Sequence, residues 1–313
     1  MKQGFSRAIP ILVCSAGLLL TACGGSGGSE SSNNSETSML SLAITDAPVD
    51  LANKIVVEFS GISLKPSSGD ALVFDFDEPQ SIDLLQLQGN AYAALLVNEQ
   101  VPAGEYSWVR LHVNALEDNV MDSYMELEDG SQIELWVPSG AQTGLKLHGG
   151  FVMPAGGAAN FTIDFDLRKS VTDPKGKASA ILKPSLRMVN NLEVGSIAGT
   201  VDSDLVNSVC ADPTMDAGAV YLFNGSDVLP VDIQGIEGDP LTTALVSSDG
   251  ENFVYEIGFV PAGDYTLAYT CEAALDDPEA ADVIVFEQSD NVTVSSGEQT
   301  LFDIAPVAPE TEQ

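Results

Sequence analysis

The segment that decides the fold is FTIDFDLR, residues 161–168, in which apolar and polar side chains alternate at every step. A period of two is the pattern of a β-strand with one face on a core. Residues 108–113 repeat it, with Val109, Leu111 and Val113 on one face. No long 3.6-residue period competes, and only one short helix is expected, between residues 81 and 97. The predicted fold class is all-β, with two sandwiches of the immunoglobulin-like or transthyretin-like kind.

One hairpin can be placed in register from the sequence alone. Met125, Leu127, Ile133 and Leu135 are expected to face inward. A three-residue loop at 129–131 keeps them on one face by pairing Leu127 with Ile133 and Met125 with Leu135. The same register sets two glutamates opposite each other on the outer face, which is unfavourable unless their charge is screened or bridged.

The chain contains a short internal repeat. The hexapeptide VPAGEY at 101–106 returns as VPAGDY at 260–265. In each copy the Pro-Ala-Gly triplet is expected to turn the chain and the tyrosine to begin a strand. Two copies so far apart indicate two related sandwiches rather than a tandem array.

Charge divides the chain at residues 190–193. The whole chain has 12 Lys and Arg against 46 Asp and Glu, a formal charge of -34, and its segment 194–313 holds 23 acids without Lys, Arg or His. This balance argues against nucleic-acid partners, because the phosphate backbone is also negative. With 2 His in all, most His-based catalytic and zinc sites are excluded. The acidic half indicates adaptation to a salty medium or a divalent-cation site, for which the candidate ligands are Asp276, Asp277, Glu279 and Asp282.

The N-terminus has the features of a secretory leader. Lys2 and Arg7 precede an apolar run from Ala8 to Leu20, which is too short to span a membrane. The run ends in LTAC, with Cys23 as its last residue, and this tetrapeptide resembles the bacterial lipobox. The resemblance implies cleavage after residue 22, lipidation of Cys23 and, with Gly rather than Asp at position 24, transfer to the outer membrane. Several acyl chains anchor a protein stably.

These observations divide the chain into five parts. They are a signal peptide at 1–22, a Gly/Ser-rich tether at 23–38, a first sandwich at 39–191, a second sandwich at 195–306 and a disordered tail at 307–313.

Both sandwiches resemble known families. The first resembles domain of unknown function 4382, and the segments that carry the resemblance are 42–48, 101–106, 137–147, 164–171 and 181–184. That family brings no activity with it. The second resembles the carboxypeptidase regulatory-like, transthyretin-type module through segments 195–201, 219–222, 249–253, 260–267 and 301–304. Such modules are accessory or adhesive, which implies that this one is not catalytic.

Cys210 and Cys271 lie in the same half of the chain. In an oxidising compartment they are expected to form a disulfide. Two free thiols or a metal pair are the alternative, although no His or third Cys accompanies them.

Two groups of side chains are candidates for binding. The pair Asp164 and Asp166 shares a strand face with Arg168. Two carboxylates there suit a glycosidase or a Ca²⁺ site, but solvated surface is the ordinary outcome, and the nearby Arg168 favours an ion pair over either. Trp108, Arg110 and His112 share another face, where an exposed indole beside Arg suits stacking on a sugar or a protein partner. Packing under a loop is the ordinary outcome for such a tryptophan.

The function expected from the sequence is that of a non-catalytic lipoprotein, anchored in the bacterial envelope by its lipid and acting as a binding or structural module. The ligand would be a protein or a glycan, no cofactor is expected apart from Ca²⁺ as an option, and the alternatives are a carboxylate-dependent envelope hydrolase and a Ca²⁺-dependent adhesin. A pocket with two or more carboxylates of raised pKa would favour the hydrolase, whereas an open sandwich face would favour the module.

Overall fold

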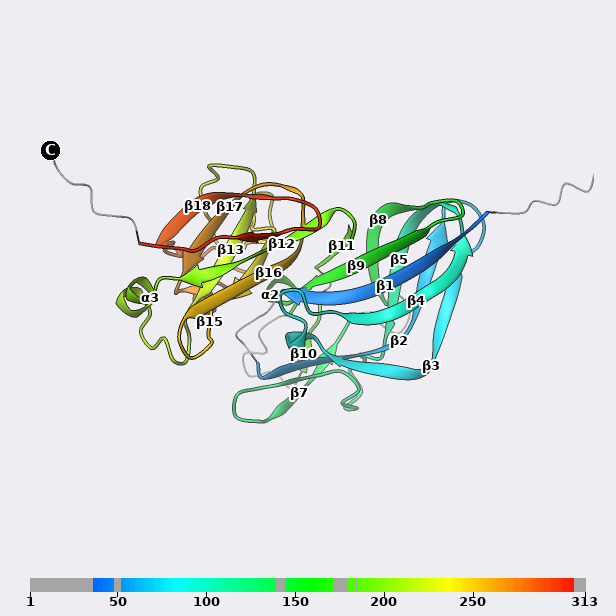
Figure 1. Cartoon of the computed structure of the whole chain (residues 1–313). Helices are drawn as coiled ribbons and strands as arrows, with labels where there is room; N and C mark the ends of the chain where they lie inside the picture. Colours follow the sequence, from blue (N-terminus) through cyan, green and yellow to red (C-terminus); the bar gives the residue numbers. More distant parts are fainter. Residues whose placement is uncertain (1–35, 48–51, 139–143, 172–178, 184, 307–313) are drawn as a thin grey trace, which may run out of the picture. The chain divides into compact units, whose positions relative to one another are not determined.

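The computed structural model describes residues 36–47, 52–138, 144–171, 179–183 and 185–306. Residues 35–313 form one compact unit. Within it the described strands make four sheets, two before residue 191 and two after residue 193 (Figure 1). We call these two pairs the first and the second sandwich. The predicted all-β class is confirmed.

The first sandwich is built around one apolar core shared by its two sheets. The smaller sheet contains, in spatial order, β11 (Leu186–Asn190), β9 (Ala158–Asp166), β1 (Thr37–Ala47) and β4 (Ala93–Pro102). The larger contains β10 (Ser179–Ile181), β7 (Gln132–Trp136), β6 (Tyr124–Glu126), β2 (Lys54–Pro66), β5 (Gly104–Val113) and β8 (Leu145–Met153), with β3 (Leu72–Asp83) also paired to β2. Phe165 of β9 meets Phe59 of β2 edge-on across the core. Strand alternation therefore places the apolar face of 161–165 as the sequence predicts.

The short helix expected between residues 81 and 97 is reduced to one 3₁₀ turn, η1 (Leu84–Gln86). Strand β3 extends to Asp83 and β4 begins at Ala93, so strand pairing takes most of that window. Residues 167–168 do not continue β9 either, because α2 (Leu167–Ser170) begins there with Asp166 as its N-cap.

The second sandwich has two four-stranded sheets. One contains β15 (Ser247–Ser248), β16 (Phe253–Pro261), β12 (Val194–Val201) and β19 (Gln299–Leu301), and the other β14 (Thr242–Leu245), β13 (Ala219–Asn224), β17 (Gly263–Thr270) and β18 (Gln288–Val294). The connections carry α3 (Ser203–Val209) and η2 (Ala273–Leu275). A disulfide joins Cys210, directly after α3, to Cys271, directly after β17, with the Cα atoms 5.3 Å apart.

The repeated hexapeptide forms the same corner in both sandwiches. At Ala103 the chain passes from β4 in one sheet to β5 in the other, and at Ala262 it passes from β16 to β17 in the same way. The hydroxyl of Tyr106 donates to the carbonyl of Pro102 at 2.8 Å, and that of Tyr265 donates to Pro261 at 2.7 Å. Both tyrosines are buried, so each ring closes the end of its sandwich while its hydroxyl holds the turn.

The β6–β7 hairpin has a different register from the predicted one. Met125 pairs with Ile133 and Glu126 with Gln132, a shift of two residues. The shift keeps every side chain on its predicted face but separates the two glutamates. Glu126 lies beside Lys54 of β2 at 3.2 Å, and the loop is closed by the Leu127 amide, which donates to the Ser131 carbonyl at 2.9 Å. The hydrophobic pattern alone cannot distinguish the two registers, because both keep the same faces.

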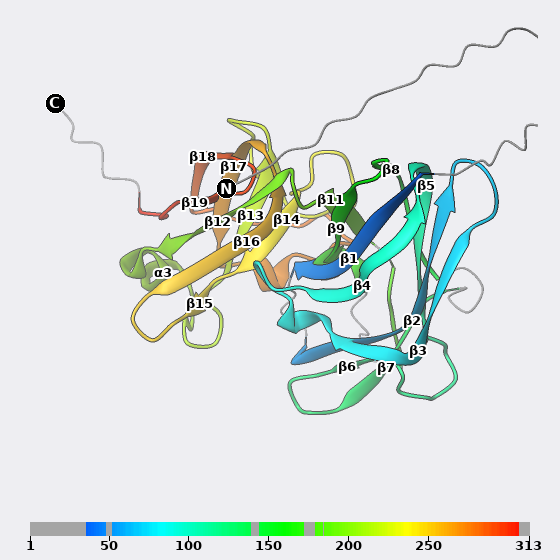
Figure 2. The ribbon, with the colours of Figure 1, turned by 45° about the vertical axis from the view of Figure 1, so that its right-hand side comes forward.

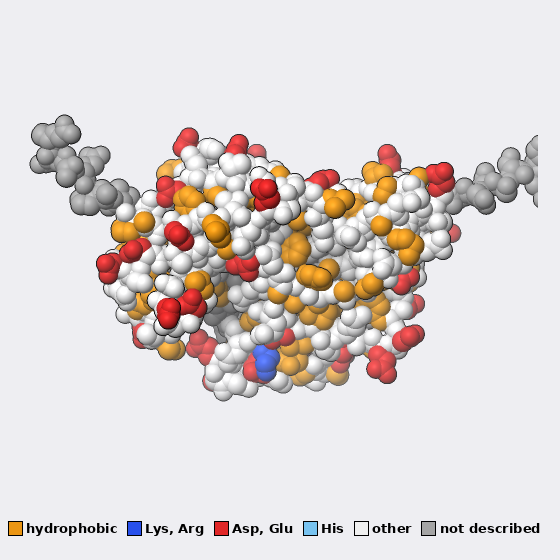
Figure 3. All heavy atoms as spheres, viewed as in Figure 1, with side chains coloured by type: hydrophobic (Ala, Val, Ile, Leu, Met, Phe, Trp, Pro, Cys, Tyr) orange, Lys and Arg blue, Asp and Glu red, His pale blue; other side chains and the backbone are white. Residues whose placement is uncertain are grey.

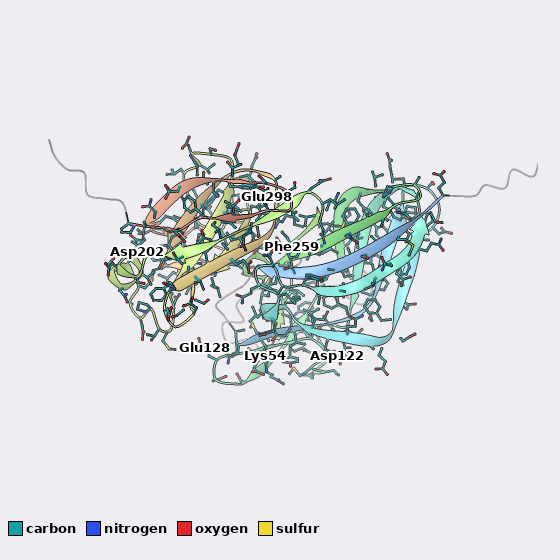
Figure 4. The ribbon with its side chains drawn as sticks, in the orientation of Figure 1. Lys54, Asp122, Glu128, Asp202, Phe259 and Glu298 are labelled. Carbon is teal, nitrogen blue, oxygen red and sulfur yellow. A yellow bond between two sulfur atoms is a disulfide. The ribbon has the colours of Figure 1, made fainter. Side chains whose placement is uncertain are left out.

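The two sandwiches meet along the sheet that contains β1 and β9, which lies beside the second sandwich in both views (Figures 1 and 2). The backbones of Gly89 and Gly258 touch so closely that a Cβ on Gly258 would lie 2.0 Å from the Gly89 carbonyl oxygen. Asn90 donates to Glu256 at 2.6 Å beside this contact. The ring of Phe259, labelled at the junction in Figure 4, meets the ring of Tyr92 edge-on. Among the described residues, no helix is long and apolar enough to cross a membrane.

Candidate functional site

A cavity of about 570 Å³ lies between the two sandwiches, on a side that is hollowed in the space-filling view (Figure 3). The first sandwich contributes the end of β1, the loop after η1 and Asp164 of β9. The second contributes parts of β12, β14, β15, β16 and β19 together with Asp303. Its volume falls in the range of small-molecule sites, which are commonly located at domain interfaces.

Asp46, at the end of β1, is the most unusual residue of this cavity. Asp46 is 5% exposed, and neither of its carboxylate oxygens is accessible to solvent. Burial raises the pKa of Asp46 well above its usual value, and the charges of Asp164 and Asp166 raise it further, while a hydrogen bond from the Leu167 amide opposes them in part. A buried negative charge with so little compensation is expensive, so burial favours the protonated form of this group.

Thr45, the residue before Asp46, forms hydrogen bonds that hold the wall of the cavity in place. The hydroxyl of Thr45 donates to the carbonyls of Leu87 and Ala91, at 2.9 and 2.7 Å. The amide of Asp46 donates to Leu87 at 3.1 Å. These bonds hold the loop after η1 against the end of β1 and thereby fix where Asp46 lies.

Asp164 and Asp166 are buried, at 6% and 7% exposure, which corrects the expectation of a solvated face. Their side of β9 looks toward the second sandwich, and periodicity within one strand cannot reveal a second domain. Asp164 pairs with Arg187 at 2.5 Å, and Asp166 pairs with Lys169 at 2.9 Å. The expected ion pair with Arg168 is replaced by these two. Burial raises the pKa of Asp164, and the guanidinium of Arg187 opposes this.

Arg168 turns toward the second sandwich instead. Its guanidinium donates to the carbonyl of Ala273 at 2.7 Å, and Lys169 donates to the carbonyl of Pro240 at 2.6 Å. Lys183 forms an ion pair with Glu279. The second sandwich, which has no basic side chain of its own, is therefore approached by cations of the first. This arrangement relieves part of the repulsion that its charge implies.

The second sandwich supplies the opposite wall. Thr243 of β14 is 3% exposed, and its hydroxyl has no hydrogen-bond partner. Glu256 accepts from Asn90 and Gln299, and Asp303 accepts from Thr200. The two carboxylates of this wall are thus held by donors, whereas the Thr243 hydroxyl is not.

The cavity meets one condition set for the hydrolase alternative, because Asp46 and Asp164 both line it and both have a raised pKa. The proposed pair Asp164 and Asp166 does not form the site, since Asp166 does not line the cavity. Hydrolysis by carboxylates needs one free acid and one free base. Arg187 holds Asp164 in an ion pair, and both carboxylate oxygens of Asp46 are shielded from solvent, so neither group is free to act on a substrate in the cavity.

Trp108, Arg110 and His112 lie together on β5, apart from this cavity. The Arg110 guanidinium carbon and the Lys146 amine lie 4.9 and 4.8 Å from the Trp108 ring centroid. The ring therefore already has two cationic partners within the chain. His112 contacts the Ser63 hydroxyl at 2.7 Å. Burial lowers the pKa of His112, as does the charge of Arg110.

Of the four acids considered as cation ligands, Asp276 and Asp282 come together, joined by Asp232. One carboxylate oxygen from each of these three lies within 4.8 Å of the others. Asp276 accepts from the Tyr221 hydroxyl and the Ile233 amide, while Asp232 accepts from the Asp282 amide. Burial raises the pKa of Asp276, and the Tyr221 bond opposes this. These hydrogen bonds account for the trio without an ion, and Glu279 is held apart by Lys183.

We expect the full chain to unfold at a higher temperature in about 0.1 M NaCl than in about 0.01 M, because the Debye length contracts from about 30 Å to about 10 Å. CaCl₂ at matched ionic strength is expected to raise the unfolding temperature equally, because the acidic trio is satisfied by hydrogen bonds. Calorimetry measures both effects. A larger rise with CaCl₂ that Asp282→Asn abolishes would identify the trio as a cation site, and no response to either salt would contradict screening.

Sequence reasoning overlooked Asp46 and Thr243. A signal for Asp46 was present, because Leu40, Leu42 and Ile44 share its strand parity and are fully buried. An acid that continues an apolar face is a candidate for a buried functional group. Thr243 carries no comparable signal, because its burial depends on contacts with other parts of the chain.

The leader, Cys23, residues 24–35 of the predicted tether and the tail at 307–313 lie outside the described residues, whereas Thr37 and Ser38 at the end of the predicted tether already belong to β1.

Residues 37–184 match the family model for a domain of unknown function, DUF4382. The match confirms the resemblance of the first sandwich to that family. The resemblance of the second sandwich to carboxypeptidase regulatory-like modules stays a prediction. No curated protein matches the chain.

Several solved structures show a distant likeness. The TIE protein of Bacillus anthracis is 11% identical, with a TM-score of 0.21 over 86% of this chain and 34% of its own, so the chain spans about a third of it. The minor pilin GBS52 of Streptococcus agalactiae is 11% identical, with a TM-score of 0.20 over 87% of this chain and 99% of its own. A putative adhesin from Bacteroides ovatus is 10% identical, with a TM-score of 0.22 over 94% of this chain and 100% of its own. TM-scores this low do not define a shared fold.

Proposed function

We propose that the chain is a non-catalytic binding protein of the bacterial envelope, anchored through lipid on Cys23, that holds a small polar solute between its two sandwiches. The observation that supports the binding role is the cavity itself, which has a volume of about 570 Å³ and is lined by residues of both sandwiches. Concave sites of this size at the junction of two domains are where small molecules commonly bind. The anchor rests on the lipobox-like sequence alone.

The close glycine contact supports a built cavity rather than a chance gap. Gly89 and Gly258 bring the two backbones together at its edge, and Asn90 and Glu256 fasten them. A cavity whose walls come from two domains also allows ligand binding to stabilise the junction. The ligand then raises the unfolding temperature by mass action on the folded state.

A variant whose cavity is filled by a large side chain tests the binding proposal directly. Ser247 is exposed and lines the cavity, so Ser247→Trp inserts an indole there without disturbing the core. We expect at least one compound from a panel of sugars, amino acids, amines and dicarboxylates to raise the unfolding temperature of the wild-type chain but not of Ser247→Trp. Ser248→Trp, a neighbouring exposed position that does not line the cavity, is the matched control.

The proposal fails if no compound shifts the unfolding temperature, or if the shifts persist in Ser247→Trp. Release of 4-nitrophenol from 4-nitrophenyl glycosides, abolished by Asp46→Asn, would instead favour the hydrolase.

A further inference from the structure

Basic side chains gather on one face of the first sandwich. Strands β2, β5 and β8 are neighbours in the larger sheet (Figure 1), and their outward positions carry Lys65, Trp108, Arg110, Lys146 and His148. Strand pairing sets Trp108 between Lys65 and His148, and it sets Arg110 opposite Lys146. The inward residues of the same strands belong to the apolar core. We call these five outward residues the cationic face.

The cations of this face have no acidic partner, although the chain has 46 Asp and Glu against 12 Lys and Arg. Lys65, Arg110 and Lys146 form no ion pair with a carboxylate of the described residues. Lys65 donates to the carbonyl of Gly69. The other described Lys and Arg side chains form ion pairs or, for the last, donate to a backbone carbonyl; they are Lys54, Lys169, Lys183, Arg187 and Arg168. The cations left without an acid therefore share one sheet face.

Two of these cations lie close together against the indole of Trp108. The Arg110 guanidinium carbon and the Lys146 amine are 4.9 and 4.8 Å from the same ring centroid. Like charges at opposite positions of neighbouring strands repel each other. Both side chains are partly exposed, and Nε is the buried, unpartnered nitrogen of the Arg110 guanidinium, so its terminal nitrogens are the ones that a ligand reaches. An anionic group beside both cations would replace their repulsion with two attractions.

Acids border the cationic face and limit the shape of its partner. Asp75 of β3 lies beyond β2, next to Gly61, and Glu105 is an exposed residue near the start of β5. Three neighbouring strands are only about 10 Å wide. A broad anionic surface, such as a membrane or a second copy of this chain, would also meet these acids and the rest of a chain with a formal charge of -34. A narrow chain with spaced charges avoids them.

Among narrow polyanions, the rings of the face favour a sugar chain. Trp108 and His148 are opposite each other on β5 and β8, and flat rings on a strand surface suit contact with the apolar C–H edges of sugars. An acidic peptide needs no such rings. A nucleic-acid duplex carries one charge per about 1.7 Å of its axis, which is too dense for a few cations in a strongly acidic protein. An acidic polysaccharide carries at most a few charges per sugar.

We propose that the cationic face binds an acidic polysaccharide, with a carboxylate or sulfate group of one sugar held between Arg110 and Lys146 and the chain continuing past Lys65. The planar guanidinium matches two oxygens of such a group, whereas the ammonium groups act as point charges. None of the five residues of the face lines the cavity between the sandwiches. The face is therefore a second binding surface, independent of the solute site proposed above.

The experiment is calorimetric titration of the full chain in detergent, at neutral pH and about 0.15 M NaCl, where the Debye length of about 8 Å screens the distant acids. The probes are polygalacturonate and heparin, which carry carboxylate and sulfate groups. Their neutral counterparts are fully methyl-esterified polygalacturonate and dextran. We expect at least one acidic probe to bind at about 0.1 mM or below, and its neutral counterpart to bind at least about tenfold more weakly.

Variants of the two central cations locate the binding. Arg110→Gln and Lys146→Gln are each expected to weaken the acidic probe at least about tenfold. Arg110→Lys, which keeps the charge but loses the planar fork, should weaken it several-fold. The matched control is Lys54→Gln, which removes one positive charge from an exposed residue of the same sandwich (Figure 4) and should leave the affinity unchanged. The unfolding temperature of each variant shows that the chain remains folded.

The alternatives give separate results. Binding of neither acidic probe, or equal weakening by Lys54→Gln and Arg110→Gln, overturns the proposal. So does a neutral counterpart that binds as tightly as its acidic probe, because charge is then not recognised. Poly-L-glutamate or phosphatidylglycerol vesicles that bind more tightly than both polysaccharides, and depend on Arg110, would overturn the sugar chain in favour of an acidic peptide or a membrane. Loss of acidic-probe binding in Ser247→Trp would place the probe in the cavity instead, whereas unchanged binding there supports a separate face.

Discussion

Replacing the disulfide with Cys210→Ser and Cys271→Ser is expected to lower the free energy of unfolding of the second sandwich by about 4 kcal/mol. The bridge spans a sequence separation of 61, and cross-linking a loop of that length removes much of the freedom of the unfolded chain. A loss of this size is a large part of the stability of an ordinary domain. The effect should exceed that of any single surface substitution in the same sandwich.

The local structure explains why the bridge matters here. It ties the end of α3 to the end of β17, and Tyr269 places its hydroxyl 3.2 and 3.1 Å from the two sulfurs and donates to the carbonyl of Ala217 at 2.8 Å. Segment 194–313, which contains the second sandwich, has 23 acids and no side-chain cation to offset them. A covalent link is insensitive to that repulsion, whereas hydrogen bonds and packing must work against it.

Urea unfolding of the full chain, followed by far-ultraviolet circular dichroism, measures the loss. Reducing agent is the control, because it should destabilise the wild-type chain by a similar amount and leave the double variant unchanged. Unchanged stability of the double variant would contradict the prediction. Complete alkylation of both thiols in unreduced, denatured protein would show that the bridge does not form.

The parts of the fold that follow from local rules could be predicted from the sequence. Alternation in residues 161–165 and 109–113 predicts the core-facing sides of these strands correctly, since the apolar residues of both segments belong to one shared core. The repeated hexapeptide predicts a turn in each sandwich, and both copies form the same tyrosine-closed corner. These features depend on a few neighbouring residues, which is why a single sequence is sufficient.

The features that depend on contacts between distant segments could not be predicted. Asp164 and Asp166 were expected to be solvated, because the pattern of one strand contains no information about their partners Arg187 of β11 and Lys169 of α2. The β6–β7 register differs by two residues from the predicted one, and both registers keep the same side chains on each face, so alternation could not select between them. The cavity is lined in part by Gly89 and Gly258, two residues far apart in the sequence whose backbones touch. Neither glycine belongs to a recognisable motif.

Asp46 lies between these cases. Its parity with Leu40, Leu42 and Ile44 marks it as an acid on an apolar face. Periodicity can therefore identify the residue as exceptional. Its state of protonation depends on neighbours from other segments, which raise its pKa. A search for charged residues at inward positions of predicted strands would have found the centre of the candidate site.

Cys23→Ala is expected to abolish membrane association of the full chain almost completely. The expectation follows from the lipobox-like LTAC sequence at 20–23, which gives Cys23 the position that receives lipid. Each buried methylene contributes about 0.8 kcal/mol to membrane binding, so loss of several acyl chains shifts the equilibrium far toward the aqueous phase. Without that cysteine the leader should also remain uncleaved after Ala22, or the chain should be released.

Detergent-phase partitioning and intact mass of the expressed protein measure both effects. The sequence offers a matched control in Cys14, a second cysteine inside the apolar run of the leader. Cys14→Ala removes the same thiol chemistry nine residues earlier and should leave partitioning and processing normal. Normal partitioning and processing of Cys23→Ala would overturn the lipid anchor. That result would leave the cavity between the sandwiches unaffected, because its walls are built from residues far from the leader.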